Sequence, residues 1–221
     1  RGVDRSRGDC LIGLPLQRNK KPKTTTKRIL PMVAPSHFLS TPQAARKAAH
    51  RRTFHLEAFE RADGLLDLEV LLEDSKSEEF TTKATHFPCG VPVHLMALRL
   101  AVNQSMDVIS AESNMQRMPF PDVCPEAQDR VQWLVGANLL KGFRQEVAKR
   151  ITAAERCSHL SEIATPMPTL AIQAMFRQQV EAEKKNAETS RPLKIGGCHA
   201  WREDGVLVQQ HYPRWHVTKP V

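Results

Sequence analysis

The residue types best suited to chemistry in this sequence are its scattered cysteines and histidines. Four of them fall where one predicted element gives way to the next: His94, Cys124, Cys157 and His159. Thiolate and imidazole groups suit zinc or an iron–sulfur cluster, and a helix N-terminus favours the thiolate form of a nearby cysteine. The first three lie about thirty residues apart. Spacing alone therefore also fits buried structural cysteines and a hydrogen-bonded histidine.

Two other groups of polar residues are further candidates for a site. Acidic residues gather on and beside one predicted hairpin: Asp63, Asp67, Glu69, Glu73 and Asp74. Strand alternation places Asp67, Glu69 and Glu57 on one face, which fits an acidic metal or substrate patch, or a solvated face with cross-strand ion pairs. Cys198 and His199 form a further pair of soft ligands.

Several catalytic and cofactor motifs are absent from the sequence. Neither GxGxxG nor GxxxxGK[ST] occurs, so we expect no nucleotide cofactor. GxSxG, CxxC and HExxH are also missing. The sequence assigns no catalytic residue and leaves open whether the protein is an enzyme.

Two stretches of period-two alternation predict the β-hairpins that would position these residues. Apolar residues alternate with polar ones on both sides of the turn Asp63-Gly64, from Phe54 to Leu72. The same pattern in 98–102 and 108–112 flanks Asn103-Gln104-Ser105. Consecutive hairpins predict an antiparallel sheet.

Helical patterns follow the second hairpin. We expect one helix from Cys124-Pro125 to Gly136, a second from about Gly142, a short third after Cys157 and a fourth over about 169–188. A last hairpin is predicted from 193–195 and 206–208. Together these elements predict an α+β fold, an antiparallel sheet of hairpins with about four helices packed on one face.

The positive charge of the chain is concentrated at its N-terminal end. The 221 residues carry a net charge of +8. Residues 1–52 hold 13 Lys and Arg against 2 Asp and Glu, and residues 53–221 hold 19 against 22. We expect a basic, disordered arm over 1–49, with a short helix over 43–49, and a single α+β domain over 50–221. The arm fits a solvated tail, a polyanion-binding segment or a transit-type peptide.

Composition also bounds the partners and the compartment. Because the body of the chain is slightly acidic, we expect no sequence-specific nucleic-acid binding. No apolar run approaches the roughly 20 residues of a membrane helix. The five cysteines, an odd number at wide spacings, predict a reducing, cytoplasmic setting. A protein partner, or a polyanion bound through the arm, stays open.

Six segments carry a family resemblance, and they span about three quarters of the chain. They are Arg61-Ala62-Asp63-Gly64-Leu65-Leu66-Asp67, Asp74-Ser75-Lys76, Gly90-Val91-Pro92-Val93-His94, Cys124-Pro125, Cys157-Ser158-His159-Leu160 and Tyr212-Pro213-Arg214-Trp215. The stretch from His50 to Trp215 resembles a bacterial family, domain of unknown function 2889. Arg156 stands where that family usually has Gly before the cysteine. The resemblance implies a class of protein and no activity.

The order of elements is similar to that of a second family, the iron–sulfur cluster assembly scaffold proteins of the IscU and NifU type. That resemblance implies ligands at His94 or Cys89, at Cys124, and at Cys157 beside His159. The histidine here follows the third cysteine instead of preceding it, and no aspartate follows the first ligand position. These departures leave a zinc site, a histidine-ligated cluster or no metal as alternatives.

We therefore predict a metal site formed by His94, Cys124, Cys157 and His159. It would hold zinc or an iron–sulfur cluster, in a protein that handles or senses metal. The alternatives are a metal-assisted enzyme acting on a small molecule and a metal-free structural or interaction module.

Overall fold

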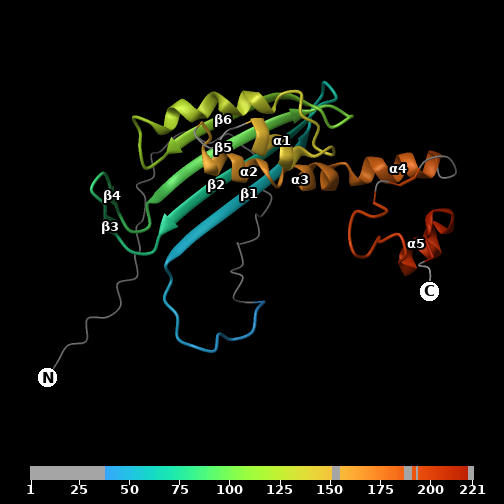
Figure 1. Ribbon diagram of the computed structural model, residues 1–221, viewed down its shortest axis with the longest axis horizontal. Helices are drawn as coiled ribbons and strands as arrows, with labels where there is room; N and C mark the ends of the chain where they lie inside the picture. Colours follow the sequence, from blue (N-terminus) through green and yellow to red (C-terminus); the bar gives the residue numbers. More distant parts are fainter. Residues whose placement is uncertain (1–37, 151–154, 187–190, 193, 219–221) are drawn as a thin grey trace, which may run out of the picture. The chain divides into compact units, whose positions relative to one another are not determined.

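In the computed structural model, the two predicted hairpins form one four-stranded antiparallel sheet (Figure 1). Its strands are β1 (His50–Glu60), β2 (Leu66–Lys76), β5 (Pro92–Val102) and β6 (Val108–Arg117), in the order β1-β2-β5-β6. Gly64 makes the first turn at a φ of 85°, a conformation that glycine adopts without steric cost. Both predicted hairpins are confirmed.

The structure describes residues 38–150, 155–186, 191–192 and 194–218. The chain divides into two compact units, Arg1–Met167 and Pro168–Val221. The predicted single domain over 50–221 stays a prediction. The predicted arm lies mostly outside the described residues. Residues 43–49, which are described, are exposed and form no helix, so the short helix predicted there is wrong.

Helices of the first unit cover one face of the sheet (Figure 1). They are η2 (Cys124–Leu134), α1 (Phe143–Arg150) and α2 (Ser158–Ala164). The alternate residues of β2 that face them are buried: Leu66, Leu68, Val70 and Leu72. We call this the helix face, and the opposite side, which carries the exposed Leu71, the open face. The α+β fold with helices on one face is confirmed.

Two details of the first unit were not predicted. The helix at Cys124–Leu134 is a 3-10 helix, unusually long for that type. The polar stretch after β2 contains a second, two-stranded sheet of β3 (Phe80–Thr81) and β4 (His86–Phe87), in which the rings of Phe80 and Phe87 stack. The pattern at Cys124–Leu134 predicts a helix but not its type, and β3 and β4 are too short to show a periodic pattern.

The second unit is helical in its described residues. It contains most of α3 (Met167–Ala174), which begins at the last residue of the first unit, and α4 (Phe176–Asn186), α5 (Val206–His211) and the 3-10 turn η3 (Pro213–Trp215). The predicted helix over 169–188 is therefore two helices separated at Met175. None of the helices in the described ranges combines the length and the hydrophobicity that a membrane span requires.

The predicted last hairpin is wrong. Residues 206–208 open α5, in which the amide of Gln209 donates to the carbonyl of Gly205 at 3.0 Å and that of Tyr212 to Val208 at 2.8 Å. Three consecutive apolar residues are too short a run to distinguish a strand from one turn of helix. Leu193, in the other predicted strand, lies outside the described residues.

Candidate metal centre

A row of polar residues crosses three strands on the helix face. The register sets Arg52 of β1 opposite Asp74 of β2, and Asp74 opposite His94 of β5. Asp74 is only 1% exposed and is the one buried charged residue in the described part of the chain. A buried carboxylate needs a cation or hydrogen-bond donors to remain ionised. Its strand neighbours supply both.

Both oxygens of the Asp74 carboxylate are occupied. Arg52 donates to Oδ2 from Nη2 at 2.5 Å and from Nε at 3.2 Å, while Nδ1 of His94 lies 3.1 Å from Oδ1. Burial disfavours the charged carboxylate, but the hydrogen bonds from Arg52 and His94 outweigh it and hold the pKa of Asp74 below its usual value. Asp74 is therefore an anion at neutral pH.

The first turns of α2 bring a second histidine to this row. The ring of His159 stacks on that of His94, with 3.7 Å between ring centroids. One helical turn further on, Glu162 accepts a hydrogen bond from Nη1 of Arg52 at 2.6 Å. Residues three apart lie on the same side of a helix. The ion pair with Arg52 thus anchors the side of α2 that carries His159.

The imidazole of His159 favours its neutral form. Burial, followed by the positive potential of His94 and Arg52, lowers the pKa of His159 below its ordinary value. A neutral imidazole has a free lone pair, which is the form that binds a metal ion.

Asp74, His94 and His159 form the one cluster of metal-binding side chains in the described ranges. One donor atom from each lies within 4.8 Å of the other two. Tetrahedral coordination with bonds of about 2.0–2.1 Å separates neighbouring ligand atoms by roughly 3.3 Å. The 3.1 Å between His94 and Asp74 is close to that separation and is equally an ordinary hydrogen-bond distance. The arrangement can hold a divalent ion or act as a hydrogen-bonded ion pair.

A pocket of about 380 Å³ opens beside the two histidines. His94, Cys124, Cys157 and His159 all line it. The structure therefore brings the four residues singled out in the sequence to one pocket. Cys124 begins η2 and Cys157 precedes α2, as expected. Neither thiol belongs to the compact cluster, so that cluster differs from the predicted ligand set by having Asp74 in place of the cysteines.

Sequence reasoning missed the roles of Arg52 and Asp74. The sequence groups Asp74 with the acidic residues of the hairpin. Because Asp74 lies two residues after Leu72 in β2, however, both side chains are on the helix face. The available signal was the register itself. Counting outward from Asp63, the middle residue of the turn Ala62-Asp63-Gly64, sets Arg52 opposite Asp74. A two-residue turn at Asp63-Gly64 would instead set Arg52 opposite Ser75. A charged pair at an otherwise apolar, inward position indicates a function or a buried ion pair.

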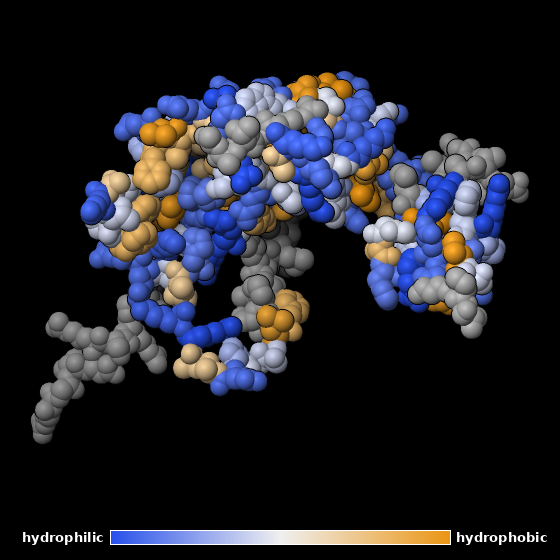
Figure 2. All heavy atoms as spheres, in the orientation of Figure 1, coloured by the Kyte–Doolittle hydropathy of each residue, from blue (hydrophilic) through white to orange (hydrophobic). Residues whose placement is uncertain are grey.

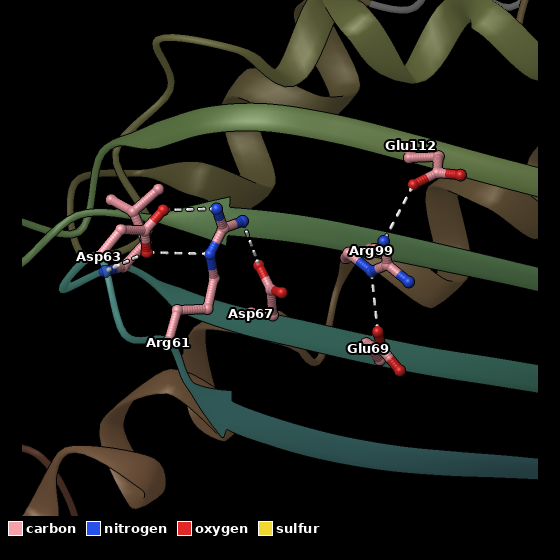
Figure 3. A network of polar contacts seen from close by, with 7 residues as sticks. Arg61, Asp63, Asp67, Glu69, Arg99 and Glu112 are labelled. Atoms are coloured by element: carbon pink, nitrogen blue, oxygen red, sulfur yellow. Dashed lines mark hydrogen bonds and ion pairs between the residues drawn. The ribbon is translucent and has the colours of Figure 1, made fainter.

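Three further acidic residues of the hairpin, Asp63, Asp67 and Glu69, form ion pairs at the turn and on the open face. Arg99 bridges Glu69, at 2.8 Å, and Glu112, at 3.2 Å, across three strands (Figure 3). At the turn of the first hairpin, Arg61 forms ion pairs with both Asp63 and Asp67 (Figure 3). This agrees with the interpretation as a solvated face. Hydrophilic residues also predominate on the visible side of the first unit (Figure 2).

The second cysteine–histidine pair lies in the second unit. Cys198 is exposed, and Nε2 of His199 lies 3.3 Å from Nη1 of Arg202. Among the residues that the structure describes, neither joins a group of three metal-binding side chains.

Comparison with known protein families gives one match. A family model described as "Protein of unknown function (DUF2889)" matches residues 50–173, which include β1 to β6 and all residues of the cluster. No curated protein and no solved structure matches the chain. The resemblance to iron–sulfur scaffold proteins has no support from these comparisons.

Proposed function

This chain belongs to the DUF2889 family, and we propose that it binds one divalent transition-metal ion, zinc or ferrous iron, through Asp74, His94 and His159. The observation that carries the proposal is the convergence of these three donors within 4.8 Å, two of them imidazoles and one a carboxylate held ionised. Two histidines and one carboxylate are a recurrent ligand set for zinc and for non-haem ferrous iron.

The surrounding residues would orient the ligands. Arg52 occupies Oδ2 of Asp74, which leaves Oδ1 directed at His94. Glu162 fixes Arg52 in turn. Side chains that hold metal ligands in place in this way raise the affinity of a site, because the ligands lose less freedom when the metal binds. The Arg52 cation also limits the negative charge at the site, which favours a divalent over a trivalent ion.

The ligand set favours a single ion over an iron–sulfur cluster. Clusters are held chiefly by thiolates, and neither Cys124 nor Cys157 joins the compact group. Cys124 and Cys157 would then line the pocket beside the ion without binding it.

The test is the metal content of the full chain, purified without oxygen and dialysed against zinc or ferrous iron. We expect one ion per chain, retained in Cys124→Ser and Cys157→Ser and lost in His94→Gln and His159→Gln. His55→Gln, at an exposed histidine on the open face, is the matched control and should keep the ion.

The outcomes separate the alternatives. Loss of metal in the cysteine variants would favour the ligand set predicted from the sequence. A chain that binds no ion in any form would remove both metal hypotheses and leave a metal-free module built on the Arg52–Asp74–His94 network. Circular dichroism of each variant ensures that loss of metal is not loss of the fold.

A second candidate, a metal-assisted enzyme, is favoured by the pocket. Three protein ligands leave a coordination position for water or substrate, as catalytic sites do and structural zinc sites do not. Since His94 and His159 line the pocket, that position would open into it. Azide added to the cobalt-substituted protein should change its visible spectrum if the position is open. An unchanged spectrum would favour a closed, structural site.

A further inference from the structure

Strand β1 ends the sheet on one side with a long unpaired edge. All eleven of its residues pair with β2, from His50 opposite Lys76 to Glu60 opposite Leu66, without a bulge. No other strand in the described part of the chain pairs with its far edge (Figure 1). Natural sheets often block such an edge with proline, lysine, a bulge, a short strand or an inward-pointing charge. β1 has no proline, lysine or bulge, and its inward-pointing charge, Arg52, is neutralised by Asp74 within the same sheet.

The opposite edge of the same sheet is closed by side chains. The side-chain carbonyl of Gln128 accepts a hydrogen bond from the amide of Met115 at 3.3 Å, and the side-chain amide of Gln132 donates to the carbonyl of Ala111. Both glutamines belong to η2, so this helix occupies backbone groups of β6 that a further strand would use. The contrast leaves β1 as the edge available for strand addition.

The charges of β1 are complementary to a second copy of the same strand. Arg51 lies near its beginning and Glu57 near its end, both exposed and both on the open face. Arg51 forms no ion pair with a described residue. When two such strands run antiparallel with Phe54 opposite Phe54, each Arg51 faces the Glu57 of the other copy. A parallel arrangement would set like charges side by side.

The apolar residues of the edge favour the same arrangement. Phe54 is 37% exposed and, opposite Leu72, lies on the helix face. In the antiparallel register the two Phe54 rings meet at the twofold axis and cover each other. Paired aromatic side chains across neighbouring strands add to the stability of strand pairing.

We propose that β1 pairs with β1 of a second copy of this chain, so that two four-stranded sheets join across a twofold axis at Phe54. Such an interface is isologous, because each copy supplies the same strand. The proposal does not depend on the metal centre.

The test is the mass of the full chain in solution, measured by sedimentation over a range of concentrations. We expect a dimer whose dissociation constant rises at least tenfold in Arg51→Glu and in Glu57→Arg, because each change sets like charges opposite each other twice. The double variant Arg51→Glu/Glu57→Arg exchanges the charges and should restore the dimer. Circular dichroism ensures that all three variants are folded.

Glu112→Arg is the matched control, since Glu112 is an exposed acid on the open face at the far side of the sheet. It should leave the dissociation constant unchanged. A wild-type monomer at every concentration would overturn the proposal, whether the edge is bare or covered by another part of the chain. The proposal would also be overturned if neither single variant raised the dissociation constant of the dimer. The same holds if the double variant did not restore that constant.

Discussion

At the scale of single residues, the candidate centre depends on Asp74, a carboxylate that is almost fully buried. Its charge is tolerated because Arg52 and His94 lie beside it in the register of three strands. Removing one partner of a buried ion pair leaves an uncompensated charge, and that cost exceeds the net contribution of the intact pair. The exposed ion pairs of Arg99 on the open face should therefore contribute less to the free energy of unfolding.

We expect Arg52→Met to lower the free energy of unfolding by about 2 kcal/mol, because the buried Asp74 then keeps only His94 as a hydrogen-bond partner. Arg99→Met removes a bridge between exposed carboxylates and should cost no more than about 1 kcal/mol. Urea unfolding of the two variants measures both values. If both variants lost the same free energy of unfolding, the ion pair of Asp74 would contribute no more to stability than one on the surface.

The histidine of α2 predicts a dependence on pH. The pKa of His159 is lowered in the folded chain by burial and by its neighbours, whereas in the unfolded chain it takes its ordinary value of about 6.5. The unfolded state thus binds the proton first as the pH falls. The contribution to stability is complete above about pH 6.5 and is lost as the pH falls through the folded pKa.

Chelator-treated protein should therefore lose stability on acidification below about pH 6.5. His159→Gln should lose less over the same interval, since the substituted side chain does not titrate. Urea unfolding at a series of pH values compares the two slopes. Identical slopes would exclude His159 as the source.

At the scale of elements, alternation was enough to predict the sheet, since a strand with one buried face repeats every two residues over a long run. It failed at 206–208, where three apolar residues fit a helical turn equally well. The periodic pattern of apolar residues also did not predict that α3 and α4 are separate helices, divided at Met175. Local pattern is informative in proportion to its length.

The assignment of the two sheet faces can be tested within β2. Leu68 is fully buried on the helix face, whereas Leu71 is 40% exposed on the open face. We expect Leu68→Ala to lower the free energy of unfolding by about 2–5 kcal/mol through the lost burial and the cavity. Leu71→Ala should cost less than about 1 kcal/mol. Thermal and urea unfolding measure both, and a reversed order would contradict the register.

At the scale of the whole molecule, the sequence singled out four residues that line one pocket, but it did not predict which side chains form the compact cluster. His94, Cys124, Cys157 and His159 come from three segments far apart in the chain, yet they line one pocket. Their order along the chain and the places of Cys124 and Cys157 at helix starts were visible in the sequence, whereas His94, expected just before a strand, is the third residue of β5. The substitution of Asp74 for the cysteines in the compact cluster depends on which way side chains point, which requires the register and packing of the sheet.

Metal binding should be visible in the stability of the entire chain. A ligand that binds only the folded state adds about 2.7 kcal/mol at a free concentration one hundred times its Kd. We expect zinc to raise the Tm of the wild-type protein and a chelator to reverse the increase. His159→Gln should show neither shift. A rise of equal size in that variant would assign the effect to another site.

The most direct measurement is X-ray absorption at the zinc edge of the zinc-loaded full chain. The account predicts only nitrogen and oxygen neighbours at about 2.0–2.1 Å, with the outer-shell pattern of two imidazoles from His94 and His159. Sulfur neighbours at about 2.3 Å would contradict it and would show that Cys124 or Cys157 is a ligand in place of Asp74.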